Sequence, residues 1–133
     1  MPCVACGDEV VDASVPESIR QYAPDGAASI SLCTRCLTVD SGADPRADAD
    51  EPDFSRVSDA FPTRHEPAVA LALVIHHCDS LVTNRAAIET LLEDVERAGV
   101  DPLLTIDRLL ADPSVEPAVD LERRRHKLED LLY

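Results

Sequence analysis

Two cysteine motifs near the N-terminus, CVACG at residues 3–7 and CTRCL at residues 33–37, are the strongest signal in this 133-residue chain. Each C-x-x-C pair folds into a tight turn, called a knuckle below, that directs two sulfur atoms at one point. With 26 residues between Cys6 and Cys33, the two pairs have the spacing of a four-thiolate zinc site. Gly7 follows the first knuckle and can adopt the positive φ that such a turn often needs. We predict that Cys3, Cys6, Cys33 and Cys36 bind one metal ion.

The predicted metal is zinc in a structural role. Four protein ligands complete a tetrahedron and leave no open position for water or substrate. Two disulfides are disfavoured in a chain expected to be cytoplasmic, and a redox-active C-x-x-C pair normally lies in a thioredoxin-like setting. Iron can use the same four ligands, but rubredoxin-type sites are wrapped in several aromatic rings, and residues 1–39 contain only Tyr22.

Residues 1–39 are predicted to form a zinc ribbon, in which short β-hairpins carry the two knuckles. Residues 9–15 are predicted to form one strand. Residues 28–32 alternate between apolar and polar side chains, which predicts a second strand that leads directly into the second knuckle. The connection between the two strands, residues 16–25, contains a predicted helical turn at residues 18–22. With so few large apolar side chains, this segment needs metal binding to supply much of its folding free energy.

An acidic stretch follows the ribbon. Residues 40–53 carry many carboxylates and no large apolar side chain, so they cannot bury a core. Phe54, Val57 and Phe61 then recur at helical spacing and predict a short helical turn that docks on a neighbouring element. We assign residues 40–62 to an acidic linker that includes this turn.

Residues 63–133 show helical periodicity and are predicted to form a small bundle of three or four helices. The expected helices span residues 67–81, 84–98, 102–111 and 117–132. Three of them begin with an acidic residue followed by proline, which suits a helix start because proline's missing N–H costs nothing there. These starts are Glu66-Pro67, Asp101-Pro102 and Glu116-Pro117. The fold class is therefore α+β.

The charge of the chain restricts its binding partners. It carries 26 acidic against 12 basic residues, a formal net charge of −14, which disfavours independent binding to nucleic acid or to anionic lipid. No apolar run approaches the roughly 18 residues of a membrane span. The first residues show no secretory signal, so we expect a cytoplasmic protein.

Other candidate residues have a simpler structural interpretation. Cys78 follows His76 and His77, but consecutive helical residues point about 100° apart, so core packing is favoured over a second metal site. The basic run at residues 123–127 lies in the second half of the last predicted helix, where cations suit the helix dipole. The chain lacks a phosphate-binding glycine loop and any nucleophile motif. We therefore expect that it is not an enzyme.

The composition resembles that of proteins from extremely halophilic archaea, since aspartate exceeds glutamate and eleven of the twelve cations are arginine. The cysteine motifs of residues 1–39 resemble a zinc ribbon, although Leu37 stands where glycine often follows the second knuckle. The chain is similar to small zinc-ribbon proteins of haloarchaea that form a domain family of unknown function. This resemblance implies zinc binding and no established activity.

Three functional hypotheses remain open from the sequence. The favoured one is a non-catalytic protein-interaction or regulatory module whose partner is another protein. The second is a nucleic-acid-associated accessory factor within a larger transcription or translation complex, which would use Arg20, Arg35 and the run at residues 123–127. The third, which requires iron, is a redox or electron-transfer protein.

Overall fold

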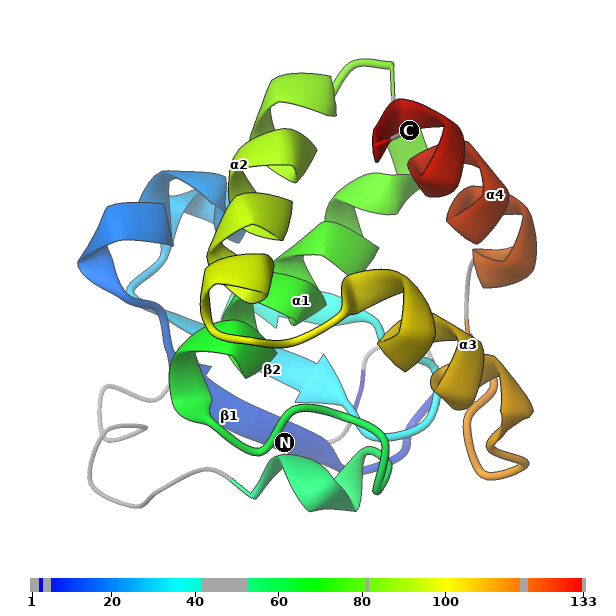
Figure 1. The fold of residues 1–133 in the computed structure, drawn as a ribbon. Coiled ribbons are helices and arrows are strands. Elements are labelled where there is room, and N and C mark those ends of the chain that lie inside the picture. The colour runs from blue at the N-terminus through cyan, green and yellow to red at the C-terminus, as the bar shows by residue number, and fades with distance from the viewer. Residues whose placement is uncertain (1–2, 4–5, 42–52, 81, 118–119, 133) are drawn as a thin grey trace.

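In the part of the chain that the structure describes, a three-stranded antiparallel sheet precedes four α-helices, which confirms the α+β class (Figure 1). The computed structural model describes residues 3, 6–41, 53–80, 82–117 and 120–132. The strands are β1 (Val10–Ser14), β2 (Ser29–Cys33) and β3 (Val39–Ser41), and the helices are α1 (His65–His77), α2 (Arg85–Arg97), α3 (Pro102–Ala111) and α4 (Leu121–Leu132). The 3₁₀ turns are η1 (Glu17–Tyr22), η2 (Pro24–Gly26), η3 (Phe54–Arg56) and η4 (Cys78–Ser80).

The sheet has the strand order β1-β2-β3 and buries one face through alternate residues. Leu32 at its centre is fully buried, with Val11 of β1 opposite it on one side and Val39 of β3 on the other. The strand β3 was not predicted, and it extends into the stretch assigned to the acidic linker. Residues 42–52 of that stretch lie outside the described residues.

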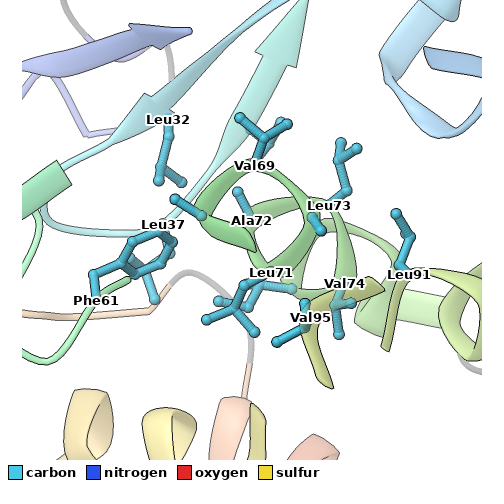
Figure 2. Packing of buried hydrophobic residues seen from close by; sticks show 14 of the residues in the cluster. Leu32, Leu37, Phe61, Val69, Leu71, Ala72, Leu73, Val74, Leu91 and Val95 are labelled. Atoms are coloured by element: carbon cyan, nitrogen blue, oxygen red, sulfur yellow. The ribbon is translucent and has the colours of Figure 1, made fainter. Parts of the chain in front are cut away.

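Helix α1 lies at the centre of the fold. Every residue from 67 to 75 is buried, which is why the sequence is apolar on all sides of this helix. Figure 2 shows Leu32 and Leu37 packing on one side of α1, whereas Leu91 and Val95 of α2 lie on another. The helix is thus enclosed between the sheet and α2.

The sheet and the helices share one hydrophobic core. Buried side chains of β1 and β2 belong to the same cluster as those of the four helices. Phe54, the first residue of η3, and Phe61, which follows that turn, join this cluster with their ring centroids 5.9 Å apart. The N-terminal sheet therefore packs on the helices of the same chain.

The ends of α2 and α3 follow local sequence signals. Helix α3 begins at Pro102, and the Asp101 carboxylate accepts a hydrogen bond from the Leu104 amide at 3.1 Å, as expected of an N-cap. Gly99, just beyond α2, has φ 85° and donates its amide hydrogen bond to the Glu96 carbonyl, which is a common helix ending. Both helices lie within one residue of their predicted bounds.

Helix α4 begins at Leu121, four residues later than predicted. Its first turn is capped by the Asp120 carboxylate, which accepts a hydrogen bond from the Arg123 amide at 3.1 Å. The predicted start at Glu116-Pro117 is wrong, since Pro117 is not helical and Asp120 caps the helix instead. The Glu116 amide donates to the Arg35 carbonyl at 2.7 Å, and residues 118–119 lie outside the described ones.

In the described ranges, none of the helices combines the length and the apolar character needed to cross a membrane.

Candidate metal centre

The first knuckle has a closed backbone geometry that is set by Cys3 and Gly7. The Cys3 amide donates to the Asp8 carbonyl at 2.7 Å, and the Gly7 amide donates to the Cys3 carbonyl at 2.9 Å. Gly7 has φ 80°, a conformation that glycine adopts without steric cost. The sequence-based expectation for this glycine is confirmed.

The second knuckle repeats this geometry at the end of β2. The Cys33 amide donates to the Thr38 carbonyl at 2.9 Å, as the Cys3 amide does to Asp8. Leu37 occupies the position equivalent to Gly7 and has φ 63°. Leucine pays a steric penalty in this conformation, but its side chain is only 2 % exposed and packs in the main core. Burial of Leu37 explains how a knuckle without glycine is maintained.

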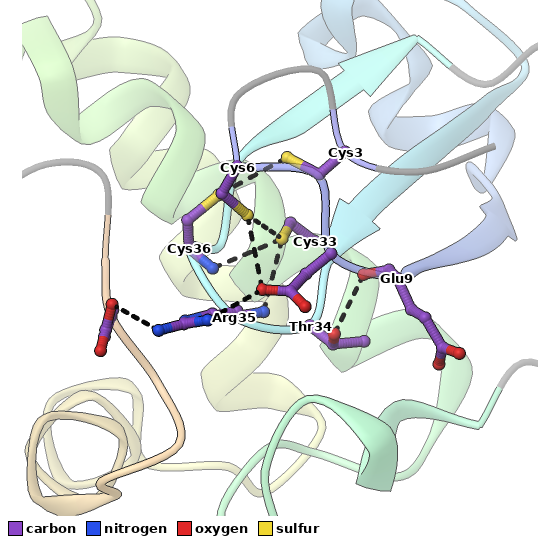
Figure 3. A network of polar contacts seen from close by, with 9 residues as sticks. Cys3, Cys6, Glu9, Cys33, Thr34, Arg35 and Cys36 are labelled. Atoms are coloured by element: carbon purple, nitrogen blue, oxygen red, sulfur yellow. Dashed lines mark hydrogen bonds and ion pairs between the residues drawn. The ribbon is translucent and has the colours of Figure 1, made fainter.

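The two knuckles bring all four predicted cysteines together (Figure 3). Their sulfur atoms lie within 4.8 Å of one another, with 3.4 Å between Cys6 and Cys33 and 3.6 Å between Cys3 and Cys36. Zinc–sulfur bonds of about 2.3 Å place the sulfurs of a tetrahedral site roughly 3.8 Å apart. A disulfide would require about 2.05 Å. The spacing therefore fits four ligands around one metal ion, and the four cysteines can hold such an ion.

Burial and nearby polar groups affect the protonation of Cys33 and Cys36. Burial raises the pKa of Cys33 to about 12 and also raises that of Cys36. Backbone amides of Arg35 and Cys36 donate to Cys33 Sγ at 3.4 Å, and the Thr38 hydroxyl lies 3.0 Å from Cys36 Sγ. A metal ion must displace protons from these thiols, and the surrounding donors then stabilise the resulting thiolates.

The four cysteines differ in their exposure to solvent. Cys3, Cys33 and Cys36 are buried and form a small cluster against which Val10 packs, whereas Cys6 is exposed. The cluster is separate from the main hydrophobic core. The candidate site therefore lies at the edge of the fold, with Cys6 on its open side.

Arg35 connects the second knuckle to two other segments. Its guanidinium pairs with Asp8 beside the first knuckle at 3.3 Å and with Glu116, in the connection between α3 and α4, at 3.1 Å. These contacts raise the pKa of Arg35, with the Glu116 carboxylate as the larger cause. Neither Asp8 nor Glu116 was predicted from the sequence to contact Arg35, because only the folded chain brings them to the second knuckle.

The remaining candidate residues do not form a second metal site. Among the described residues, the four cysteines are the single group of His, Cys, Asp and Glu side chains with metal-binding spacing. Cys78 is fully buried in the main core, in agreement with the packing interpretation. His77 Nε2 lies 2.8 Å from the Tyr22 carbonyl oxygen, and His65 Nε2 lies 2.7 Å from that of Ser14. Each of these histidines thus tethers one end of α1 to the N-terminal part of the chain.

Several arginines considered for nucleic-acid binding make contacts within the chain. Arg125 pairs with Asp107 at 2.8 Å and also with Glu129. Arg20 donates to the Val15 carbonyl at 3.1 Å. Arg35 likewise forms two ion pairs within the chain. These three arginines would have to give up their intrachain partners to bind the phosphates of a nucleic acid.

The fold and the cysteine cluster define an α+β protein with a candidate metal centre beside its N-terminal sheet. The chain belongs to a family of unknown function, DUF6276, whose model matches residues 2–132. The match includes the cysteine motifs and the helices, so both parts lie within one family. No curated protein and no solved structure matches the chain. The expected membership of a family of unknown function is confirmed, while the zinc-ribbon and haloarchaeal assignments stay predictions.

Proposed function

We propose that Cys3, Cys6, Cys33 and Cys36 bind one zinc ion with a structural role. The observation that carries this proposal is the convergence of four sulfurs within 4.8 Å from two knuckles of matching geometry. Four thiolates fill the tetrahedral coordination that zinc prefers, as in structural sites. The zinc ion would join the start of β1 to the end of β2, where Val10 lies opposite Cys33.

Zinc is favoured over iron by the surroundings of the sulfurs. Among the described residues, the buried cluster contains three cysteines with Val10 packed against it, and it includes no aromatic ring. Phe54 and Phe61 belong to the main core instead. This environment supports a redox-inert structural ion.

On this basis we assign the chain to the non-catalytic protein-interaction or regulatory modules, acting in the cytoplasm of a halophilic archaeon. The metal centre would hold a rigid surface that another protein recognises. The engagement of Arg20, Arg35 and Arg125 by groups of the same chain argues against a nucleic-acid partner. So does the net charge of −14.

Metal substitution tests the ligand set. Reconstitution of the full chain with Co²⁺ should give the intense visible absorption of tetrahedral thiolate coordination at one equivalent. Cys33→Ser should lose this spectrum, whereas Cys78→Ser, at a buried position outside the site, should retain it. A spectrum unchanged in Cys33→Ser would contradict the proposed ligands.

The partner class is tested by affinity purification in concentrated KCl, with the zinc-loaded chain and the Cys33→Ser variant as baits. A protein retained only by the zinc-loaded chain, and still retained after nuclease treatment, is the expected result. Loss of the complex on nuclease treatment would instead support the nucleic-acid alternative.

A further inference from the structure

Cys6 differs from the other three predicted ligands in its access to solvent. It is exposed, while Cys3, Cys33 and Cys36 are buried. Cysteine bound to a metal is a thiolate even at neutral pH, and an accessible thiolate is the form that reacts with oxidants. In a zinc-loaded site, Cys6 is thus the ligand residue most open to a dissolved oxidant.

A second thiol is placed to react with an oxidised Cys6. Cys33 Sγ lies 3.4 Å from Cys6 Sγ (Figure 3), so the two sulfurs need to approach by only about 1.4 Å to reach disulfide bonding distance. The two cysteines come from different knuckles. A bond between them would therefore remove one metal ligand from each knuckle.

We propose that Cys6 is a site of oxidation by hydrogen peroxide, and that the resulting Cys6–Cys33 disulfide releases the metal. The proposal rests on the zinc site proposed above. The protein would thus have an oxidation-sensitive site. Its reaction with peroxide would remove the structural ion and the support that the ion gives to the fold.

The reaction is balanced with peroxide as the oxidant. The Cys6 thiolate attacks one peroxide oxygen, the O–O bond breaks, and hydroxide leaves to give a sulfenic acid. The Cys33 thiolate then attacks Cys6 Sγ, the S–S bond forms, and a second hydroxide leaves. Two thiolates have lost two electrons in total, and the peroxide has become two hydroxides that take up protons as water. Only Cys3 and Cys36 remain as ligands, which is too few for a structural zinc site.

The electrostatics of the site favour an uncharged oxidant. The chain has a net charge of −14, and the Asp8 carboxylate lies 3.9 Å from Cys6 Sγ. Both features disfavour the approach of anions. Hydrogen peroxide is neutral and small, whereas anionic oxidants or thiol reagents such as Ellman's reagent should react more slowly at equal salt.

The first test uses the full zinc-loaded chain and limiting iodoacetamide. Mass spectrometry of the digested protein should show Cys6 alkylated before the other three ligands. Titration with hydrogen peroxide should then release zinc to a chromogenic chelator in step with the loss of two thiols, and peptide mapping should identify a Cys6–Cys33 disulfide. Dithiothreitol plus zinc should reverse both changes.

The matched variants are Cys6→His and Cys78→Ser. Cys6→His keeps a zinc ligand but removes the reactive thiolate, so it should slow peroxide-driven zinc release at least tenfold, whereas Cys78→Ser should react as the native chain does. Preferential alkylation of a buried cysteine, a Cys3–Cys6 disulfide, or native release rates in Cys6→His would each overturn the proposal. Failure of the zinc site itself is distinguishable, because metal analysis before peroxide treatment would then find no zinc.

Discussion

Glu116 and Arg35 contact each other at two points. The Glu116 amide donates to the Arg35 carbonyl at 2.7 Å, and the Glu116 carboxylate pairs with the Arg35 guanidinium at 3.1 Å. Arg35 lies between the two cysteines of the second knuckle, and Glu116 lies between α3 and α4. The pair therefore links the candidate metal centre directly to the helical part of the fold.

We predict that Glu116→Gln weakens zinc binding by a small factor in dilute salt. The change removes one charge from an exposed pair but keeps the backbone hydrogen bond, and exposed pairs are screened by salt. The effect should therefore shrink in concentrated KCl, as measured by competition with a zinc chelator. The matched control is Glu89→Gln, which breaks the exposed pair with Arg85 on α2 and should leave zinc affinity unchanged. Equal affinities for the two variants would refute the link.

Leu37 should respond to substitution in an order that separates backbone strain from burial. Its φ of 63° costs leucine roughly 1–2 kcal/mol, whereas removing a buried leucine side chain costs about 2–5 kcal/mol. Burial is the larger effect, so Leu37→Gly should lower the free energy of unfolding. Leu37→Ala should lower it further, because alanine keeps the strain and loses the packing. Urea unfolding of the zinc-loaded chains measures this order, and a Leu37→Gly variant as stable as the native chain would contradict it.

Asp112 should contribute a pH-dependent part of the stability. Its carboxylate accepts hydrogen bonds from the Ser114 hydroxyl and amide and from the Ser58 hydroxyl, which lower the pKa of Asp112. Because the folded pKa lies below the unfolded value, the stabilisation is present above about pH 4 and is lost as the pH falls through the lower folded pKa. Asp112→Asn should lack this component. Denaturant unfolding of both chains between pH 6 and pH 2.5, roughly spanning that window, checks the prediction, and parallel curves would contradict it.

Stability should rise with salt. A net charge of −14 destabilises the compact chain through self-repulsion, and the screening length shortens from about 10 Å at 0.1 M to about 3 Å at 1 M salt. We expect the melting temperature to increase into the molar range of KCl, and dialysis into dilute buffer to unfold the chain. Circular dichroism during dialysis measures this, and unchanged helicity in dilute buffer would remove the halophilic interpretation.

Local signals in the sequence predicted much of the fold. The α3 bounds follow from Asp101 and Pro102, and the Gly7 conformation follows from the first knuckle, because both depend on residues adjacent in the chain. The start of α4 was misplaced because the sequence offers two candidate caps, Glu116 before Pro117 and Asp120 before Leu121, and the structure uses Asp120. The strand β3 was missed because a strand of three residues is too short to show the two-residue alternation of apolar and polar side chains. The four candidate metal-binding cysteines were predicted from the spacing of the two C-x-x-C pairs. Asp8 and Thr38, which lie beside the sulfurs, belong to no sequence motif and were not predicted.

The measurement that tests the central claim most directly is elemental analysis of the full chain, purified in concentrated KCl without added metal. We expect about one zinc ion per chain, because four thiolates complete its tetrahedral coordination. Iron in its place would contradict the structural-zinc assignment and favour electron transfer. A chain free of metal, with its four ribbon cysteines reactive or joined in disulfides, would contradict the metal centre itself.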